Sequence, residues 1–308
     1  MSINSIYRES VAMEPVHHAK VALCAVPGDP PFLKYSWFEN RDYVLDLEAV
    51  LRRCSHLDYL QLHIPEYQVN RVSNWLAGPA QRLLAKAPEL HLNVMLQNID
   101  LIQGEDLAGL KRFGTVTCTT AHEAYTNAET RGRLGVTLHR LSICNGPEFH
   151  TRSGYHDKEY TLMVSHDEHP LKDLVLSKIE AELPKLRIQI VRDLFYGDYA
   201  KLAARVKWSL TFGEGLDAYF VDPVFSGGVS FAVFNERFFT PGFANVETVY
   251  PSWEVLIDRI TDDLQRLDEP VAYERCRRLP YDLLADLYST ERFRENLRMF
   301  YRGKYTFP

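Results

Sequence analysis

The sequence predicts an α/β fold made of two Rossmann-like domains with a cleft between them, closed by C-terminal helices. The length of 308 residues suits two domains of about 150 residues each. Short apolar runs alternate with longer stretches of helical spacing, which is typical of βαβ units on a parallel sheet. The polar, turn-rich segment 145–158 interrupts this alternation and is the best candidate for a linker.

Composition and charge narrow the class of protein. Hydrophobic residues make up 46% of the chain and charged residues 25%, as in ordinary soluble globular proteins. The net charge of −6 disfavours a nucleic-acid binder. No apolar run reaches the roughly 18 residues of a membrane-spanning helix, and the N-terminus lacks the apolar stretch of a secretory signal. The five cysteines form no CxxC pair, so we expect a cytoplasmic protein without disulfides or a zinc knuckle.

In the first half, each continuous apolar run that ends at a turn signal predicts a strand, and each run of helical spacing predicts a helix. The run 21–26, for example, ends at the turn-rich loop 27–31. The predicted strands are 21–26, 59–64, 90–96, 116–119 and 138–143, and the predicted helices are 43–54, 69–87, 105–111 and 122–133.

The same alternation resumes after the linker and then gives way to helical spacing alone. The predicted strands are 160–164, 186–191, 208–212 and 229–234, and the predicted helices are 171–183, 198–206, 253–267, 271–287 and 290–301, with a short turn and helix before 229. The predicted domains are therefore 1–150 and 151–285, with a helix over 286–308 that crosses back to the first domain.

The most informative stretch follows the predicted strand 208–212. Glu214 lies between Gly213 and Gly215, which allow the backbone to approach a ligand closely. Ligands of open α/β sheets bind at the carboxyl ends of the strands, where this loop is expected. Asp222 follows Glu214 after seven residues, and Pro223 suits the first position of a helix, so we expect Asp222 to be its N-cap.

These residues resemble the donor half of GT-B glycosyltransferases, especially the retaining group with a Glu-x7-Glu signature. The resemblance implies that Glu214 lies beside the donor sugar and that Asp222 binds the ribose of the nucleotide. The chain departs from the signature, because the second carboxylate is Asp and Pro223 follows it.

The resemblance extends more loosely over the rest of the chain. The strand ending in His63 is similar to one near the acceptor cleft, and Asn145-Gly146 to the step before the linker. Ser165-His166 stands where the family has Gly-Arg, and Lys172-Asp173 where it has Lys-Gly. The candidate catalytic residues are Glu214, His63 and His122; the candidate donor-binding residues are Asp222, Gly213, Gly215, His166, Lys172 and Tyr196; no metal ligands are expected.

The implied activity is metal-independent transfer of a sugar from a nucleotide-diphosphate donor to a saccharide or lipid-linked acceptor in bacterial surface polysaccharide synthesis. The nucleotide sugar is a substrate, and no cofactor is expected. Attachment to the inner face of an anionic membrane would be peripheral, through basic residues of the first domain such as Arg52, Arg53, Arg71, Arg82 and Lys86. Two alternatives stay open: a nucleotide-sugar epimerase or hydrolase of the same fold, and a degenerate GT-B protein that binds or scaffolds without catalysis.

Overall fold

The computed structural model describes residues 3–17, 19–25, 43–78, 80–84, 87 and 89–308, in two compact units. Unit 1 comprises the described residues as far as Cys144 together with Thr290–Pro308, and unit 2 is Asn145–Ser289. The loop 27–31 and Lys86, both named in the sequence-based hypotheses, lie outside the described residues.

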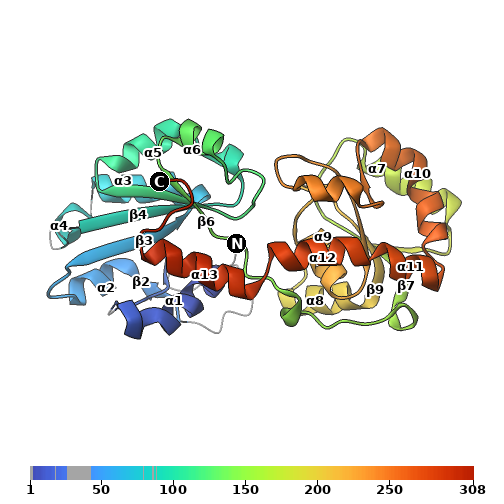
Figure 1. Ribbon diagram of the computed structural model, residues 1–308, viewed down its shortest axis with the longest axis horizontal. Helices are drawn as coiled ribbons and strands as arrows, with labels where there is room; N and C mark the ends of the chain where they lie inside the picture. The colour runs from blue at the N-terminus through green and yellow to red at the C-terminus, as the bar shows by residue number, and fades with distance from the viewer. Residues whose placement is uncertain (1–2, 18, 26–42, 79, 85–86, 88) are drawn as a thin grey trace. The chain divides into compact units, whose positions relative to one another are not determined.

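Unit 1 contains a parallel sheet whose four strands are neighbours in sequence order (Figure 1). The strands are β3 (Tyr59–Pro65), β4 (Glu89–Leu96), β5 (Thr115–Thr120) and β6 (Thr137–Arg140), with the separate parallel pair β1 (Cys24–Ala25) and β2 (Leu45–Asp46). Fully buried apolar side chains such as Leu92, Val94 and Cys118 pack against Leu76 and Leu107 of the covering helices. The alternation of apolar runs therefore predicts this sheet correctly.

Three predicted helices of unit 1 are shorter in the structure. The stretch 69–87 is interrupted, because α3 (Val69–Ala77) ends at Gly78 and α4 (Gln81–Leu84) follows. The helix predicted from residue 122 begins only at Ala128 of α6 (Ala128–Leu134), since Asn127 caps it through a bond from the Thr130 amide. The helix predicted over 43–54 is α2 (Leu47–Arg53), which begins four residues later because Leu45 and Asp46 form β2 and Asp46 is the N-cap; α5 (Gly104–Lys111) agrees with its prediction.

The two ends of the described chain meet in unit 1. Helix α1 (Ile3–His17), which the sequence does not predict, contacts α13 (Thr290–Tyr301). The Ser10 hydroxyl lies 2.6 Å from that of Tyr301, and Glu9 forms a bidentate ion pair with Arg294 at 2.8 and 2.9 Å. Beyond α13, Phe307 exchanges backbone hydrogen bonds with Leu138 of β6.

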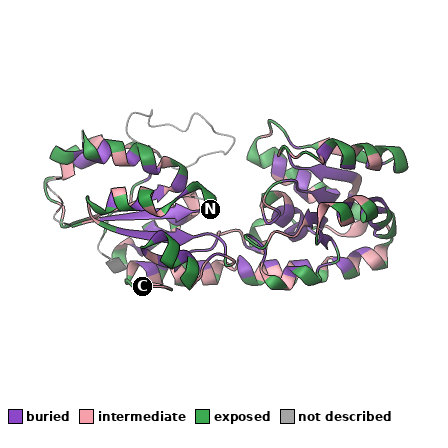
Figure 2. Ribbon diagram, turned by 90° about the horizontal axis from the view of Figure 1, so that it is seen from above, coloured by how far each residue is buried: buried purple, intermediate pink, exposed green. Residues whose placement is uncertain are grey.

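Unit 2 contains a five-stranded parallel sheet with the order β11-β10-β9-β7-β8. The strands are β7 (Glu159–Val164), β8 (Arg187–Ile190), β9 (Val206–Leu210), β10 (Val229–Val233) and β11 (Val249–Tyr250); the helices are α7 (Lys172–Glu182), α8 (Tyr196–Arg205), α9 (Ala218–Phe225), α10 (Trp253–Arg266), α11 (Pro270–Cys276) and α12 (Arg278–Leu287). Figure 2 shows that the strands of this unit are mostly buried, whereas its helices also carry exposed residues. The predicted helix 271–287 is divided between α11 and α12 at Arg277.

The predicted linker 145–158 carries two 3-10 turns, and its end is fixed within unit 2. The buried Lys158 ammonium donates to the carbonyls of Ala204 and Ser226, at 2.8 Å each. These carbonyls lie at the carboxyl ends of α8 and α9, where the helix dipole favours a cation. Lys158 therefore ties the beginning of β7 to the ends of two helices.

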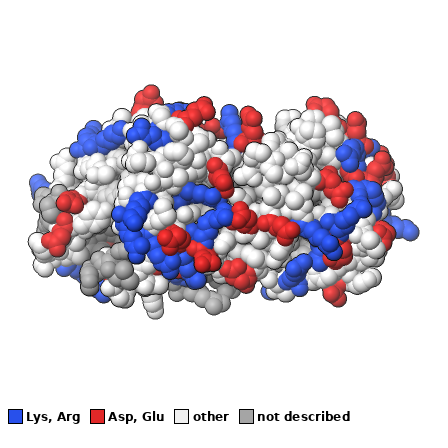
Figure 3. All heavy atoms as spheres, viewed as in Figure 1, with Lys and Arg blue, Asp and Glu red and all other residues white. Residues whose placement is uncertain are grey.

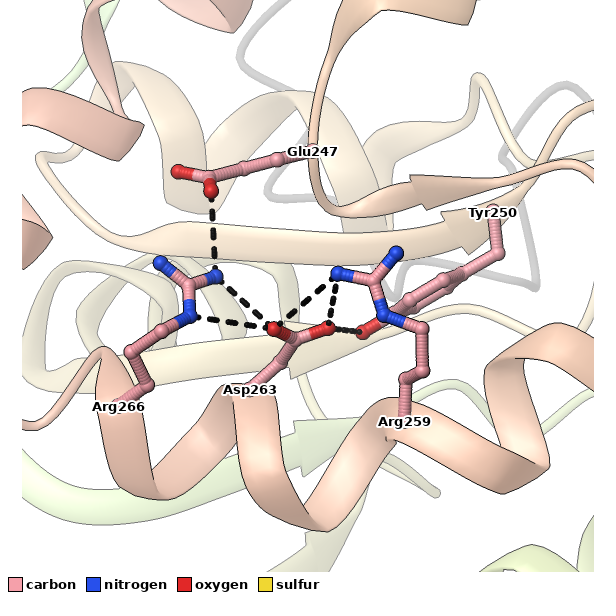
Figure 4. Close-up of polar contacts among 5 residues, drawn as sticks. All are labelled: Glu247, Tyr250, Arg259, Asp263 and Arg266. Carbon is pink, nitrogen blue, oxygen red and sulfur yellow. Dashed lines mark hydrogen bonds and ion pairs between the residues drawn. The ribbon is translucent and has the colours of Figure 1, made fainter.

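A second ionic cluster joins α10 to β11 (Figure 4). The buried Asp263 carboxylate accepts from Arg266 at 2.9 Å and from the Tyr250 hydroxyl at 2.9 Å, and Arg259 lies 3.2 Å from it. Arg266 also contacts Glu247 at 3.1 Å. All the acceptor capacity of Asp263 thus serves to hold α10 on the edge of the sheet.

Candidate functional site

The order of the strands identifies where unit 2 would bind a ligand. After β7 the chain forms β8 on one side of β7, and it then returns to form β9 on the other side. The carboxyl ends of β7 and β9 therefore flank a topological switch point, where helices leave in opposite directions and ligands of open α/β sheets bind. The segments that follow these two strands make up the candidate site.

The loop after β9 brings Gly213, Glu214 and Gly215 to this switch point, as the sequence predicts. Gly215 has φ +89°, and a Cβ there would lie 2.5 Å from the Phe239 ring. Both facts require glycine at this position. The loop therefore packs closely against Phe239 at Gly215, and the partly exposed Glu214 lies at the carboxyl edge of the sheet.

The segment after β7 contains the predicted residues His166 and Lys172. The exposed His166 ring is joined through Nδ1 to the Tyr219 hydroxyl at 2.9 Å. The buried Lys172 ammonium donates to the main-chain carbonyls of Ser165 and Asp167, at 2.8 Å each. The Ser165 hydroxyl in turn accepts from the Phe212 amide at 2.9 Å, which connects the ends of the two strands.

The helix after the loop begins earlier than predicted, so the expectation that Asp222 is its N-cap is wrong. Helix α9 begins at Ala218, and its N-cap is Asp217, which accepts from the Phe220 amide. A Thr211 hydroxyl also donates to Asp217 at 2.6 Å. Burial raises the pKa of Asp217 to about 7; the Thr211 hydrogen bond opposes this shift, and the charge of Asp167 adds to it.

Asp222 lies inside α9 in a second polar cluster of unit 2. Its buried carboxylate accepts from the Asn145 amide at 2.8 Å, and the His150 ring lies 3.9 Å away. Burial raises the pKa of Asp222 to about 6, and the hydrogen bond from Asn145 opposes the shift. Burial lowers the pKa of His150 to about 4. The cluster is therefore held by neutral donors rather than by an ion pair.

Tyr196 and Tyr199 of α8 connect the two polar clusters. The pKa of Tyr196 is raised by burial and by the charge of Asp222. The Tyr199 ring lies 5.7 Å from that of Tyr219, and its hydroxyl donates to the Ala218 carbonyl. The predicted donor-binding residues thus fall into two adjacent groups: Gly213, Gly215, His166 and Lys172 at the switch point, and Asp222 and Tyr196 along α8 and α9.

In unit 1, His63 belongs to a hydrogen-bond network on the sheet. The Asn93 amide donates to His63 Nδ1 at 3.0 Å, so the ring proton is on Nε2, which donates to the Tyr301 hydroxyl at 3.2 Å. Asn93 accepts from Thr117, which must then accept from His91. These fixed donors and acceptors hold both histidines in the neutral form against α13.

The second predicted histidine, His122, lies in the loop after β5. Its side chain is buried, and its ring is 5.6 Å from that of Tyr125. Burial lowers the pKa of His122 to about 3 and that of His63 to about 4. The structure therefore places each histidine in its own environment within unit 1, and their catalytic role stays a prediction.

The His63 network leads to a pH prediction for stability. The pKa of His63 falls from 6.5 to about 4 on folding, so the unfolded chain binds the extra proton between these values. The free energy of unfolding should therefore fall as the pH is lowered through this window. Urea unfolding at several pH values across the window measures this dependence. In His63→Gln, the slope of the unfolding free energy against pH should correspond to about one proton fewer than in the wild type. An unchanged slope in the variant would contradict the neutral network.

The described residues contain no group of three His, Cys, Asp or Glu side chains placed to hold a metal ion. None of the helices within those same residues has both the length and the apolar character required to cross a bilayer. In the view of Figure 3, basic and acidic side chains are interspersed on both units.

Comparison with solved structures identifies the fold. The chain is similar to Anabaena HepE in complex with UDP and glucose, with a TM-score of 0.55 and 9% identity over 83% of this chain and 81% of that one. Sucrose-phosphate synthase from Thermosynechococcus elongatus gives a TM-score of 0.54 at 10% identity, over 98% and 93% of the two chains. The chain therefore has the GT-B fold, and the predicted fold class is confirmed.

A third similar structure is that of accessory secretory protein 1, 2 and 3 in Streptococcus pneumoniae, with a TM-score of 0.51 and 10% identity over 83% of this chain and 56% of that one. No protein-family model and no curated protein matches the sequence. At these identities the likeness establishes the fold, whereas the Glu-x7-Asp signature stays a prediction.

Proposed function

We propose that the chain is a glycosyltransferase that uses a nucleotide-diphosphate sugar as donor. The observation that carries the proposal is the glycine-flanked Glu214 loop at the switch point of unit 2, in a fold shared with HepE, whose structure contains UDP and glucose. A carboxylate at this place can stabilise the positive charge that develops at the anomeric carbon as the diphosphate departs. Glu214 is the group proposed for this role.

The nucleotide is proposed to extend from the switch point toward α8. Tyr196, which is 42% exposed, offers a ring on which a base can stack. Asp222 supplies the ribose-binding carboxylate of the proposal, and the Asn145 bond fixes its orientation from the linker side. His166, just after the end of β7, is the proposed contact to the diphosphate. Lys172 holds the segment after β7 in place through hydrogen bonds to the carbonyls of Ser165 and Asp167.

The proposed acceptor is a saccharide or lipid-linked saccharide in bacterial surface polysaccharide synthesis, used at the inner face of the membrane without a metal cofactor. Arg53, Arg71 and Arg82 of unit 1 are exposed and are the proposed contacts to anionic lipid. Binding to vesicles with and without anionic lipid, at low and high salt, tests this attachment. Vesicle binding that depends on neither anionic lipid nor salt would contradict peripheral attachment through these arginines.

A second candidate function has its own observation. The Lys172 ammonium, which the family resemblance directs toward the diphosphate, is instead engaged with two carbonyls, and carboxylates surround the switch point. This arrangement favours a GT-B protein that has kept the fold for binding a partner rather than for catalysis. Failure of the folded chain to bind any nucleotide sugar in a thermal-shift panel would support this second candidate.

Asp222→Ala tests the proposed ribose contact. The free energy of nucleotide binding should become less favourable by about 1–3 kcal/mol, the cost of a lost hydrogen bond to a carboxylate. Titration calorimetry of the folded variant provides the measurement, with Asp173→Ala on the exposed surface of α7 as the matched control. If the Asp222 variant binds nucleotide as the wild type does but unfolds at a lower temperature, the carboxylate serves only the contact with Asn145.

A further inference from the structure

One carboxylate oxygen at the switch point has no hydrogen-bond donor. Oδ2 of Asp167 is buried and lacks a partner among the described residues. Buried polar atoms are almost always paired, and an ionised carboxylate can only accept. The Lys172 ammonium donates to the main-chain carbonyl of Asp167 and makes no hydrogen bond to this oxygen. A donor of another kind is required at Oδ2.

The geometry of Gly213 shows which group faces Asp167. A Cβ built on Gly213 would lie 2.8 Å from Oδ2 of Asp167 and 3.2 Å from Oδ2 of Asp217. Both oxygens therefore border the same small space beside the loop. Two ionised carboxylates that face one space repel each other, whereas a carboxylic acid can donate its proton to a carboxylate.

We propose that Asp167 and Asp217 share one proton at neutral pH, with the Asp217 carboxyl group donating to Oδ2 of Asp167, and that the pair positions the Gly213–Gly215 loop that carries Glu214. One O–H bond of the Asp217 acid supplies the missing donor, and no other group changes its charge. The pair is a positioning device, because neither residue is assigned a contact with the reacting atoms.

The surrounding groups determine which carboxyl group holds the proton. Burial raises the pKa of Asp217 to about 7, with the charge of Asp167 as a further cause. From α7, the Lys172 cation lies against the main chain of Asp167 and favours the charge there. The proton is therefore expected on Asp217 and the charge on Asp167.

Other titratable groups face the pair from the remaining elements. His166 and Tyr219 form their mutual bond beside it, and the pKa of Tyr219 is raised to about 12 by burial and then by the charges of Asp167 and Asp217. The pKa of Tyr199 of α8 is likewise raised, by burial and then by the charges of Asp222 and Asp217, and Glu214 is carried by the loop itself. Both tyrosines stay protonated near neutral pH. The proton shared by Asp167 and Asp217 is therefore the one expected to titrate there.

The proposal concerns the ligand-free protein and holds whether or not the chain transfers sugar. For the proposed function it has one consequence. With a proton in place, the switch point carries one negative charge fewer, which reduces the repulsion of a diphosphate. Nucleotide-sugar affinity of the wild type should therefore fall as the pH rises through about 7, and Asp217→Asn should weaken this loss.

Infrared difference spectroscopy of the ligand-free chain tests the proposal directly. Between about pH 9 and pH 6 the carbonyl band of a protonated carboxylic acid should appear, with one component near pH 7. That component should vanish in Asp217→Asn and persist in Asp222→Asn, which removes the separate acid with a pKa of about 6. A spectrum of Asp217→Asn identical to that of the wild type overturns the proposal.

Two further variants keep the test independent of any single substitution. In Asp217→Asn the amide can still donate to Asp167, so thermal stability should be retained and become insensitive to pH near 7, whereas Asp217→Ala should lose stability at every pH. Gly213→Ala places a methyl group against both carboxyl groups and should shift the midpoint of the infrared component. A midpoint that stays in place in Gly213→Ala contradicts the shared proton.

Discussion

Glu214→Gln is expected to lower the rate of sugar transfer by about 100- to 1,000-fold, the range found when one preorganised electrostatic group is removed from an active site. Glutamine keeps the volume of the side chain and its place between Gly213 and Gly215, so the loop should keep its conformation. Charge near the anomeric carbon matters most in the transition state, and nucleotide affinity should therefore change little.

The measurement for Glu214→Gln is the turnover of donor and the transfer of sugar by the purified variant, with nucleotide affinity determined in parallel. Glu180→Gln, the same substitution on the exposed surface of α7, is the matched control and should keep wild-type turnover. Transfer by Glu214→Gln at the wild-type rate would show that another group stabilises the transition state, and the resemblance to retaining enzymes would lose its main support.

Asp263→Ala is expected to lower the free energy of unfolding of unit 2 by about 3 kcal/mol, the upper range for hydrogen bonds to a charged group. The substitution leaves the buried Tyr250 hydroxyl without its acceptor and removes the partner of Arg259 and Arg266. Both arginines are partly exposed, so water solvates their charge and limits the cost.

Urea unfolding followed by circular dichroism provides the measurement for Asp263→Ala. Asp262→Ala changes the neighbouring, exposed residue of α10 and should alter stability by less than about 0.5 kcal/mol. Asp263→Asn keeps an acceptor for Tyr250 and should fall between the two. Equal stability of the Asp262 and Asp263 variants would show that the cluster in Figure 4 contributes nothing net.

Local patterns predicted the sheets well because the central strands are short, largely apolar runs that the sheet buries on both faces. The runs that became β4, β7 and β10 are of this kind. By contrast, α1 depends on contacts with α13, some 290 residues further along the chain, such as that of Ser10 with Tyr301. No window of sequence around α1 contains that information.

The candidate site shows the same limit. The glycines around Glu214 predicted its loop, because the requirement for positive φ at Gly215 is local. Pro223 suggested Asp222 as the helix N-cap, yet Asp217 holds that role, and the Gly-Leu-Asp sequence before the helix was the available signal. The proximity of Asp167 to Asp217 depends on the pairing of β7 with β9, which a single sequence does not reveal.

Binding of nucleotide sugars to the whole chain tests the central claim most directly. A calorimetric panel of nucleotide-diphosphate sugars, free nucleotides and free sugars should identify at least one intact donor that binds more tightly than either of its parts. Product analysis with that donor should then show transfer to a saccharide acceptor in the wild type and its loss in Glu214→Gln. If none of these donors binds the folded protein, the proposal that this GT-B chain is a glycosyltransferase is contradicted.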